Sequence, residues 1–215
     1  MYLHHKAGHR ISVEAKVSAL RDDTGRIVGA VEVFSDNSVK MAALQSVDRL
    51  IEESLIDPLT KVSNRRYIEI TVRGRFEEMA RYKWPFALVL CDIDRFKEIN
   101  DAHGHAVGDE VLLMVSKTLQ AAVRSFDFLG RWGGEEFLLC LPNVGDAEAL
   151  TAITERFRAL VAASSVKVDS RGLSVTASFG ATLATREDTA DSVFRRADAL
   201  LYRSKEGGRN RVTVG

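Results

Sequence analysis

The first part of the chain alternates hydrophobic and polar positions with a period of two. The segment ISVEAKVSAL (residues 11–20) is apolar at every second position, and the alternation resumes after RDDTGR in IVGAVEVF (residues 27–34). This periodicity predicts two strands joined by a turn. Because a lone hairpin is only marginally stable in water, its apolar face needs a partner. We expect the hairpin to be the end of a domain whose beginning is missing.

Residues 37–56 contain no proline or glycine, and apolar side chains recur at a rough heptad spacing from Val39 to Leu50. The pattern predicts a helix, for which two interpretations stay open. It packs as an amphipathic helix on its own domain, or it forms a two-stranded coiled coil that joins two protomers. Pro58 disfavours helix at Asp57 and ends the segment.

From residue 57 onwards, short apolar runs alternate with apolar stripes at helical spacing. Strands are predicted for FALVLC, FDFLGRW, EFLLCL, LSVTASFGATLA and RVTV. Helices are predicted where apolar residues recur every three or four positions, over residues 68–79, 111–119, 150–160 and 193–201. Strands alternating with amphipathic helices, with one hairpin in the middle, indicate an α/β or α+β sandwich.

Composition and charge narrow the functional classes. The 215 residues include 30 basic and 30 acidic side chains, so the chain lacks the basic excess that nucleic-acid binders usually carry. No run of ~18 apolar residues and no signal peptide is visible, which predicts a cytoplasmic segment without membrane contact, although the parent protein could be membrane-attached. Cys91 and Cys140 each end an apolar run, which predicts reduced, buried cysteines in neighbouring strands.

Candidate chemistry begins with RWGGEEF (residues 131–137). Between two strands, Gly133 and Gly134 supply the positive φ angles of a tight hairpin. Glu135 and Glu136 then lie where the turn meets the strand, and neighbouring strand residues point to opposite faces. One glutamate can reach a site while the other is braced or solvated. The alternative is a plain hairpin with two solvent-facing acids.

A second acidic segment follows a buried strand, in LVLCDIDRF. Asp92 is costly at that position unless it is paired, hydrogen-bonded or bound to a cation, and Asp94 has the spacing to share its face. Carboxylates at a strand end and on a hairpin tip make an oxygen-rich site that suits Mg²⁺. The alternative for Asp92 is a helix N-cap or a turn acid.

Two further polar groups fit a nucleotide. Asn100, His105 and Asp109 lie on a loop and the start of a helix, where amide and carboxylate groups can read the edge of a purine; a capped loop is the alternative. Lys205 and Arg209 flank glycines at a helix end, either as a polyphosphate clamp or as cations that complement the helix dipole. Together the groups predict a nucleoside-triphosphate enzyme that lacks the GxxxxGK[ST] loop.

These segments resemble one family throughout residues 57–215. DPLTKVSNRR, DIDRFKEIND, GHAVGDEVL, RWGGEEF, SFGAT and ADALLYRSKEGGRN occur in the order of the GGDEF domain of diguanylate cyclases, with the signature in its GGEEF variant. The resemblance implies an α+β fold, a βααββαβ sandwich with a central antiparallel sheet like that of nucleotide cyclases and polymerase palms. It also implies that two GTP molecules, held by the two facing domains of a homodimer, condense into cyclic di-GMP and two pyrophosphates.

The resemblance assigns roles to the acidic residues. Asp92, through its carboxylate, and Ile93, through its backbone carbonyl, would bind Mg²⁺ (or Mn²⁺). Glu135 would complete the metal site and assist deprotonation of the attacking 3′-hydroxyl, with Glu136 as a weaker candidate. Two metal ions that clamp the attacking and leaving oxygens would lower the barrier without covalent chemistry.

The resemblance also implies a substrate-binding set. Asn100 and Asp109 would hold guanine, His105 would be another substrate contact, and Phe96 would offer its backbone N–H to phosphate. Lys205 and Arg209 would bind the β- and γ-phosphates, while Gly133 and Gly134 would let the α-phosphate approach the backbone.

A control site is implied by RSFD, which contains Arg124 and Asp127; five residues separate Asp127 from Gly133. This matches the family's RxxD site, where the product cyclic di-GMP binds and inhibits. The rival function is therefore a catalytically silent receptor for cyclic di-GMP, although the retained signature acids favour an active enzyme. Residues 1–36 resemble the last strands of a PAS sensor domain, and residues 37–56 would be the signalling linker ahead of a catalytic domain at 57–215.

Overall fold

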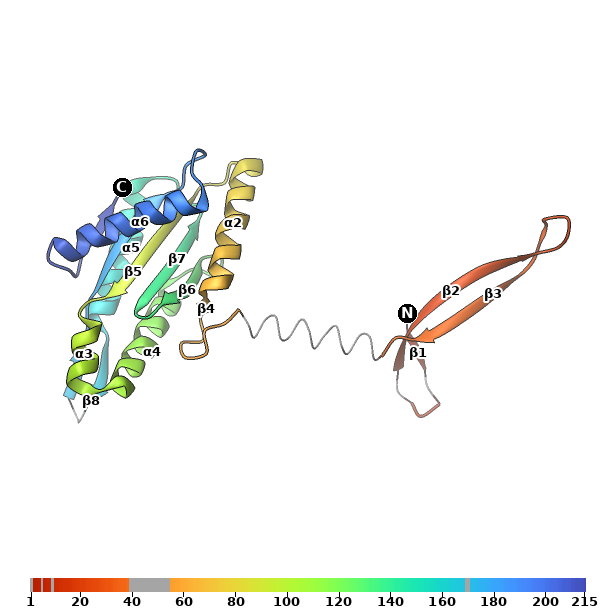
Figure 1. The fold of residues 1–215 in the computed structure, drawn as a ribbon, viewed down its shortest axis with the longest axis horizontal. Helices are drawn as coiled ribbons and strands as arrows, with labels where there is room; N and C mark the ends of the chain where they lie inside the picture. The colour runs from red at the N-terminus through yellow and green to blue at the C-terminus, as the bar shows by residue number, and fades with distance from the viewer. Residues whose placement is uncertain (1, 5, 9, 39–54, 169–170) are drawn as a thin grey trace. The chain divides into compact units, whose positions relative to one another are not determined.

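The computed structural model describes residues 2–4, 6–8, 10–38, 55–168 and 171–215 (Figure 1). The chain divides into two compact units, residues 1–54 and 55–215, and each is described by itself. The helix predicted over 37–56 falls on residues 39–54, which lie outside the described residues. None of the helices in the described part of the chain is long and apolar enough to cross a membrane.

The first unit is a three-stranded antiparallel sheet of order β1-β2-β3, made of β1 (Tyr2–His4), β2 (Arg10–Arg21) and β3 (Ile27–Asp36). The two predicted strands are confirmed. Asp22 shapes their turn, since its carboxylate accepts from the backbone N–H of Thr24 and of Arg26. Val17 and Val28 are 66% and 63% exposed, as expected for strands that have too little core of their own.

The second unit is built on a six-stranded sheet of order β11-β10-β5-β7-β6-β4. The four inner strands are antiparallel, as predicted, but both edge strands are parallel to their neighbours, so the sheet as a whole is mixed. The bounds are β4 (Ser63–Asn64), β5 (Phe86–Ile93), β6 (Phe128–Gly133), β7 (Glu136–Pro142), β10 (Ala177–Leu183) and β11 (Val212–Val214).

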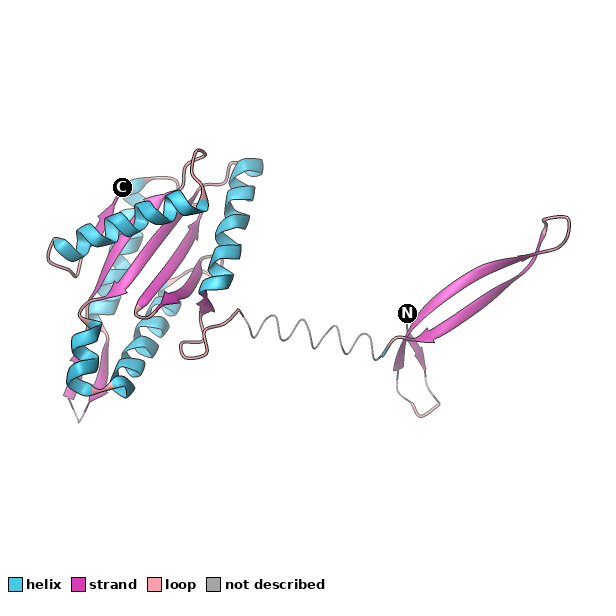
Figure 2. Cartoon of the chain, in the orientation of Figure 1, coloured by secondary structure: helices cyan, strands magenta, loops and turns pink. Residues whose placement is uncertain are grey.

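Helices cover both faces of this sheet, and Figure 2 shows the resulting layers. The cores on the two faces share the fully buried strand β5. On one face lie α2 (Arg65–Tyr82) and α6 (Ala190–Glu206), and on the other lie α4 (His105–Ala122) and α5 (Ala147–Ala163). The short helix α3 (Phe96–His103) follows β5. Apart from a small hairpin between α5 and β10, the chain from β5 to β10 has the predicted order βααββαβ.

The single long strand predicted for LSVTASFGATLA is wrong. The segment splits into β9 (Arg171–Ser174), which pairs with β8 (Ser165–Val168), and β10, which joins the main sheet. Asp94 explains the break: its backbone N–H donates to the Thr176 carbonyl, and its carboxylate accepts from the Thr176 hydroxyl. Alternation alone cannot reveal this bond between distant segments.

Helix α6 is fixed at both ends and along its length. A capping box of Thr189 and Ser192 starts it. Gly180 of β10 lies directly beneath it, because a Cβ there would stand 2.2 Å from the backbone of Ala197 and Leu201. Near its end, the buried hydroxyl of Ser204 donates to the Phe179 carbonyl at 2.7 Å. The last turn of α6 is therefore held against the sheet.

Candidate functional site

The site begins where β5 reaches the sheet edge. Asp92 pairs with Ser178 of β10 on one side and with Glu136 of β7 on the other, and its side chain is only 9% exposed. Lys205, in the last turn of α6, places its Nζ 2.7 Å from Asp92 Oδ2. Burial raises the pKa of the Asp92 carboxyl, and the nearby acids add to this effect, whereas Lys205 opposes it. A buried acid at this edge thus has a cationic partner.

Asp94, two residues further, is fully engaged in the fold. Its carboxylate accepts from the hydroxyls of Thr176 at 2.7 Å and Ser178 at 2.6 Å, and from the backbone N–H of Asn210 at 3.0 Å. The last bond holds the turn in which Arg209 and Asn210 adopt left-handed φ angles of 63° and 44°. Asp94 therefore positions the Arg209 turn, a role that sequence reasoning missed when it grouped Asp94 with Asp92.

The RWGGEEF segment forms the predicted hairpin, with Gly134 and Glu135 as its two turn residues between the paired Gly133 and Glu136. Only one of the two glycines needs its conformational freedom: Gly134 has φ 51°, while Gly133 has no positive φ. The backbone N–H of Ile93 donates to the Glu135 carbonyl at 3.4 Å. This bond brings the hairpin tip beside the end of β5, so the two acidic segments meet as predicted.

Arg131 and Asp57, which were not among the predicted site residues, hold the hairpin in place. Arg131 Nε donates to the Gly134 carbonyl at 2.9 Å, and its Nη1 lies 3.3 Å from Asp57 Oδ1. Asp57 also accepts from the backbone and hydroxyl of Thr60. Although burial opposes the shift, the Thr60 hydrogen bonds and the Arg131 charge lower the pKa of the Asp57 carboxyl. The DPLT segment, to which the sequence analysis gave no role at the site, therefore braces the hairpin.

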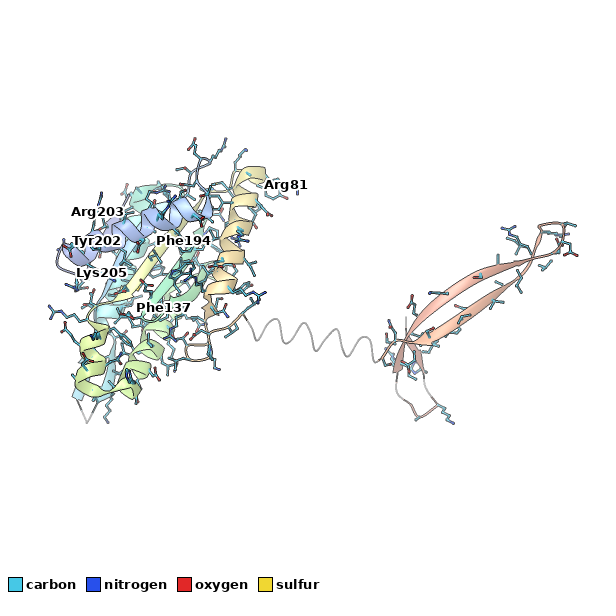
Figure 3. The ribbon with its side chains drawn as sticks, viewed as in Figure 1. Arg81, Phe137, Phe194, Tyr202, Arg203 and Lys205 are labelled. Atoms are coloured by element: carbon cyan, nitrogen blue, oxygen red, sulfur yellow. The ribbon has the colours of Figure 1, made fainter. Side chains whose placement is uncertain are left out.

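Glu136 has surroundings different from those of Glu135. It lines a groove of about 590 Å³ between α2 and α6, together with Trp132 and Phe194, whose rings stack at 4.3 Å. Figure 3 labels Phe194 on α6. Burial, and then the neighbouring Asp92 charge, raise the pKa of the Glu136 carboxyl.

The predicted purine-contacting residues lie on α3 and α4, the two helices that follow β5. Asn100 Oδ1 is buried and has no hydrogen-bond partner among the described residues. Gly108 makes room for it, because a Cβ at that position would stand 1.9 Å from Asn100 Oδ1. An unpaired buried amide oxygen is rare in proteins and fits a ligand N–H. His105 and Asp109 are exposed.

The remaining predicted residues stand at element ends. Phe96 opens α3 directly after Arg95, which caps that helix in a left-handed conformation (φ 55°) without a side-chain cap bond. Arg209 is exposed beyond the end of α6, in the turn that Asp94 holds. Figure 3 labels Lys205 on α6. Backbone N–H groups at a helix start and cations at a helix end are groups that phosphate oxygens can bind.

Arg124 and Asp127 close the turn between α4 and β6. The Arg124 backbone N–H donates to Asp127 Oδ2 at 2.8 Å, and burial raises the pKa of the Asp127 carboxyl. The Arg124 side chain is exposed, with its guanidinium 5.9 Å from the centre of the Phe126 ring. Phe126 and Trp84 are 47% and 52% exposed and line one small pocket. These two aromatic residues were missed because exposed rings leave no periodic signal.

The ligand chemistry of the acidic edge fits a divalent metal that is shared with a substrate. Within the described ranges, no three His, Cys, Asp or Glu side chains are arranged to hold a metal ion. Hard oxygen donors are available here from Asp92, Glu135 and the Ile93 carbonyl. Asp92 already binds one cation, the ammonium group of Lys205. Mg²⁺ is commonly bound by one or two carboxylates together with substrate phosphates.

The cysteine prediction is confirmed. Cys91 and Cys140 are free and buried in the neighbouring strands β5 and β7. Burial raises the pKa of the Cys91 thiol and raises that of Cys140 to about 12. Both thiols therefore stay protonated and serve as core residues.

Comparison with known proteins agrees with this geometry. A family model described as "Diguanylate cyclase, GGDEF domain" matches residues 54–211. Diguanylate cyclase DgcM of Escherichia coli (strain K12) is 38% identical over 192 residues, which are 86% of this chain and 45% of DgcM. The chain thus spans less than half the length of this relative.

Solved structures share the fold. The coiled coil and GGDEF domain of DgcB from Caulobacter crescentus, in complex with c-di-GMP, is 29% identical with a TM-score of 0.77, covering 83% of this chain and 95% of that one. The active GGEEF domain of a diguanylate cyclase from Vibrio cholerae is 33% identical with a TM-score of 0.65, covering 70% and 96%. The palm-like fold predicted from the motifs is confirmed.

Proposed function

Because this chain belongs to the GGDEF family of diguanylate cyclases, we propose that it is an active enzyme that condenses two GTP molecules into cyclic di-GMP and two pyrophosphates. One observation carries the proposal. The hairpin tip is bonded to the end of β5, so that Glu135, Asp92 and Lys205 come from three distant segments to one edge of the sheet. A plain hairpin with two solvent-facing acids does not require this convergence.

The acidic edge binds the divalent ion, Mg²⁺ or Mn²⁺, through Asp92, Glu135 and the Ile93 carbonyl. When bound, the ion supplies the positive charge that stabilises phosphoryl transfer. Glu135 also accepts the proton of the attacking 3′-hydroxyl, while Glu136, which lines the groove between α2 and α6, plays the smaller part.

The chain's other residues position the substrate. Asn100 accepts from guanine with its unpaired oxygen, and Asp109 and His105 complete the base contacts. Lys205 and Arg209 bind the β- and γ-phosphates, and the Phe96 N–H contacts phosphate. The small turn at Gly133 and Gly134 lets the α-phosphate approach the backbone.

One domain holds one GTP, so catalysis needs a homodimer in which two domains face each other. The 3′-hydroxyl of one nucleotide then attacks the α-phosphorus of the other, and holding both reactants in line supplies much of the rate. The solved GGEEF relative is described as active, which supports activity in a chain that carries the same signature. We assign this chemistry to residues 57–215, the linker role to 37–56 and a partial PAS domain to 1–36.

Cyclic di-GMP inhibits the enzyme by binding at Arg124 and Asp127. The exposed guanidinium of Arg124 can fork onto guanine or phosphate, and the turn formed by the two residues is already closed by their own hydrogen bond. The DgcB structure is a complex with c-di-GMP, which supports product binding within this fold.

The test is to incubate the protein with GTP and Mg²⁺ and to separate the nucleotides by chromatography. We expect cyclic di-GMP and pyrophosphate, with a specific activity that rises with protein concentration as dimers form. Folded, dimeric protein that binds cyclic di-GMP and makes no product would instead identify the silent receptor.

A further inference from the structure

The ion pair between Lys205 and Asp92 has a consequence for how the proposed cyclase takes up its metal, and the inference rests on the proposed function. Lys205 Nζ lies 2.7 Å from Asp92 Oδ2, and the two side chains are 31% and 9% exposed. A buried carboxylate is stable only with a partner. Lys205 supplies that partner directly.

The fold holds the lysine in this position. Ser204, the residue before it, is buried and donates to the Phe179 carbonyl and shares a 2.7 Å hydrogen bond with Thr213. The last turn of α6 is thereby fastened to β10 and β11. Only the flexible stem of Lys205 remains free to swing, and a lysine ammonium on four methylenes exchanges partners readily.

Asp94, two residues from Asp92, cannot replace it. Asp94 is occupied by Thr176, Ser178 and Asn210. Within the described residues no ready-made cluster of three metal-binding side chains exists. The protein's own donors are therefore too few to hold a hydrated divalent ion against a lysine that already neutralises one of them.

We propose that Lys205 and the divalent ion compete for Asp92, so that the site takes the metal only as a metal–nucleotide complex. A nucleoside triphosphate brings further oxygen donors for the ion and, at the same time, draws the ammonium of Lys205 onto its phosphates. Binding of the nucleotide thus frees Asp92 from Lys205 and completes the coordination of the ion. When pyrophosphate leaves, Lys205 returns to Asp92, and free metal is not retained.

The experiment measures metal affinity without nucleotide, using Mn²⁺ as the probe and the electron paramagnetic resonance signal of the free ion as the readout. Lys205→Met keeps the length of the side chain and removes its charge. We expect this variant to bind Mn²⁺ at least ten-fold more tightly than the wild-type protein, and to bind Mn²⁺ with a non-reacting GTP analogue more weakly. Arg203→Met, which removes an exposed cation on the same helix, is the matched control and should behave like the wild type.

A second substitution, Lys205→Gln, keeps a hydrogen-bond donor for Asp92 and covers the case in which the methionine variant does not fold. It should show the same gain in Mn²⁺ affinity. Equal Mn²⁺ affinities of wild type and both folded variants would overturn the inference, and the ion pair would then be structural. That result would leave the proposed function intact if the wild type still bound metal with nucleotide and formed cyclic di-GMP; loss of both would refute the function itself.

Discussion

At the scale of single residues, the two glutamates of the signature stand one position apart and have separate surroundings. The Glu135 carbonyl accepts from the Ile93 N–H, which keeps the hairpin tip beside the end of β5, while Glu136 pairs directly with Asp92 across β5 and β7. Glu136 follows on β7 and lines the groove between α2 and α6. Adjacent acids in one hairpin can therefore differ in their importance for catalysis.

Glu135→Gln should lower the turnover of GTP to cyclic di-GMP by about 100-fold or more, because in the proposed mechanism Glu135 is both a metal-binding charge and the proton acceptor, and glutamine removes both without changing size. Glu136→Gln should lower this turnover by a clearly smaller factor. Chromatographic rate assays on both variants, with circular dichroism to verify folding, test this order. Unchanged turnover in Glu135→Gln would remove Glu135 from the catalytic site.

Sequence reasoning identified residues whose roles follow from their own chemistry and missed those whose roles depend on pairing between distant segments. An acidic residue directly after a buried apolar run, such as Asp92, can be recognised from the local sequence alone. Arg131 and Asp57 are 74 positions apart, and Asp94 contacts Thr176 and Asn210 across the fold. No local pattern indicates such contacts.

At the scale of elements, α4 depends on one glycine near its start. Gly108 leaves the space that Asn100 Oδ1 occupies, since a Cβ there would stand 1.9 Å from that oxygen. Gly74 of α2 offers a contrast, because a Cβ at Gly74 meets nothing within 4 Å. The same substitution at these two helical positions should therefore have opposite effects.

Gly108→Ala should displace Asn100 and weaken GTP binding at least ten-fold, whereas Gly74→Ala should stabilise the protein by about 0.5–1 kcal/mol through helix propensity. Calorimetric titration with a non-reacting GTP analogue and urea unfolding measure the two effects. Full GTP affinity in a folded Gly108→Ala variant would contradict the assignment of Asn100.

The start of α6 is tied to the end of β10 by Arg196 and Asp188. The guanidinium donates to both Asp188 oxygens, at 2.8 and 2.7 Å, and to the Leu183 carbonyl. The Arg196 hydrogen bonds hold the pKa of the Asp188 carboxyl well below its usual range. Because α6 also carries Lys205, this anchor contributes to the geometry of the site at the other end of the helix.

A carboxyl whose folded-state pKa is lowered stabilises the fold above its unfolded pKa, about 3.9, and this contribution is lost as pH falls through the folded value. Asp188→Asn should therefore cost about 2 kcal/mol at pH 7, and the difference from wild type should shrink below about pH 4. Urea unfolding across that range measures it.

At the scale of the whole molecule, the order of elements could be predicted and the sheet edges could not. The motifs and the alternation of strands and helices implied βααββαβ with an antiparallel centre, which the structure has. The parallel edge strands β4 and β11 are two and three residues long. Strands this short carry almost no periodic signal in the sequence, and their direction therefore could not be predicted. In the structure β4 leads into helix α2, and β11 follows helix α6.

The proposed catalytic edge and the turn with Arg124 and Asp127 lie at different places in this domain, so the proposed control site can be separate from the proposed chemistry. Asp92 ends β5, whereas Arg124 and Asp127 stand in the turn that leads from α4 into β6. A change at Arg124 can therefore alter inhibition without touching the groups that bind the metal or GTP.

Arg124→Ala should raise the cyclic di-GMP concentration for half-inhibition by at least ten-fold, since a lost bidentate contact is worth about 1.4 kcal/mol or more, while the initial rate without product stays close to that of the wild type. Rate assays with added cyclic di-GMP measure the shift, and Arg186→Ala, an exposed arginine outside that turn, is the control. Product held between two domains would also change the oligomeric state of the protein. The molar mass of the wild type should therefore differ with and without cyclic di-GMP, and Arg124→Ala should abolish this difference. An unaltered inhibition curve would place product binding elsewhere on the domain.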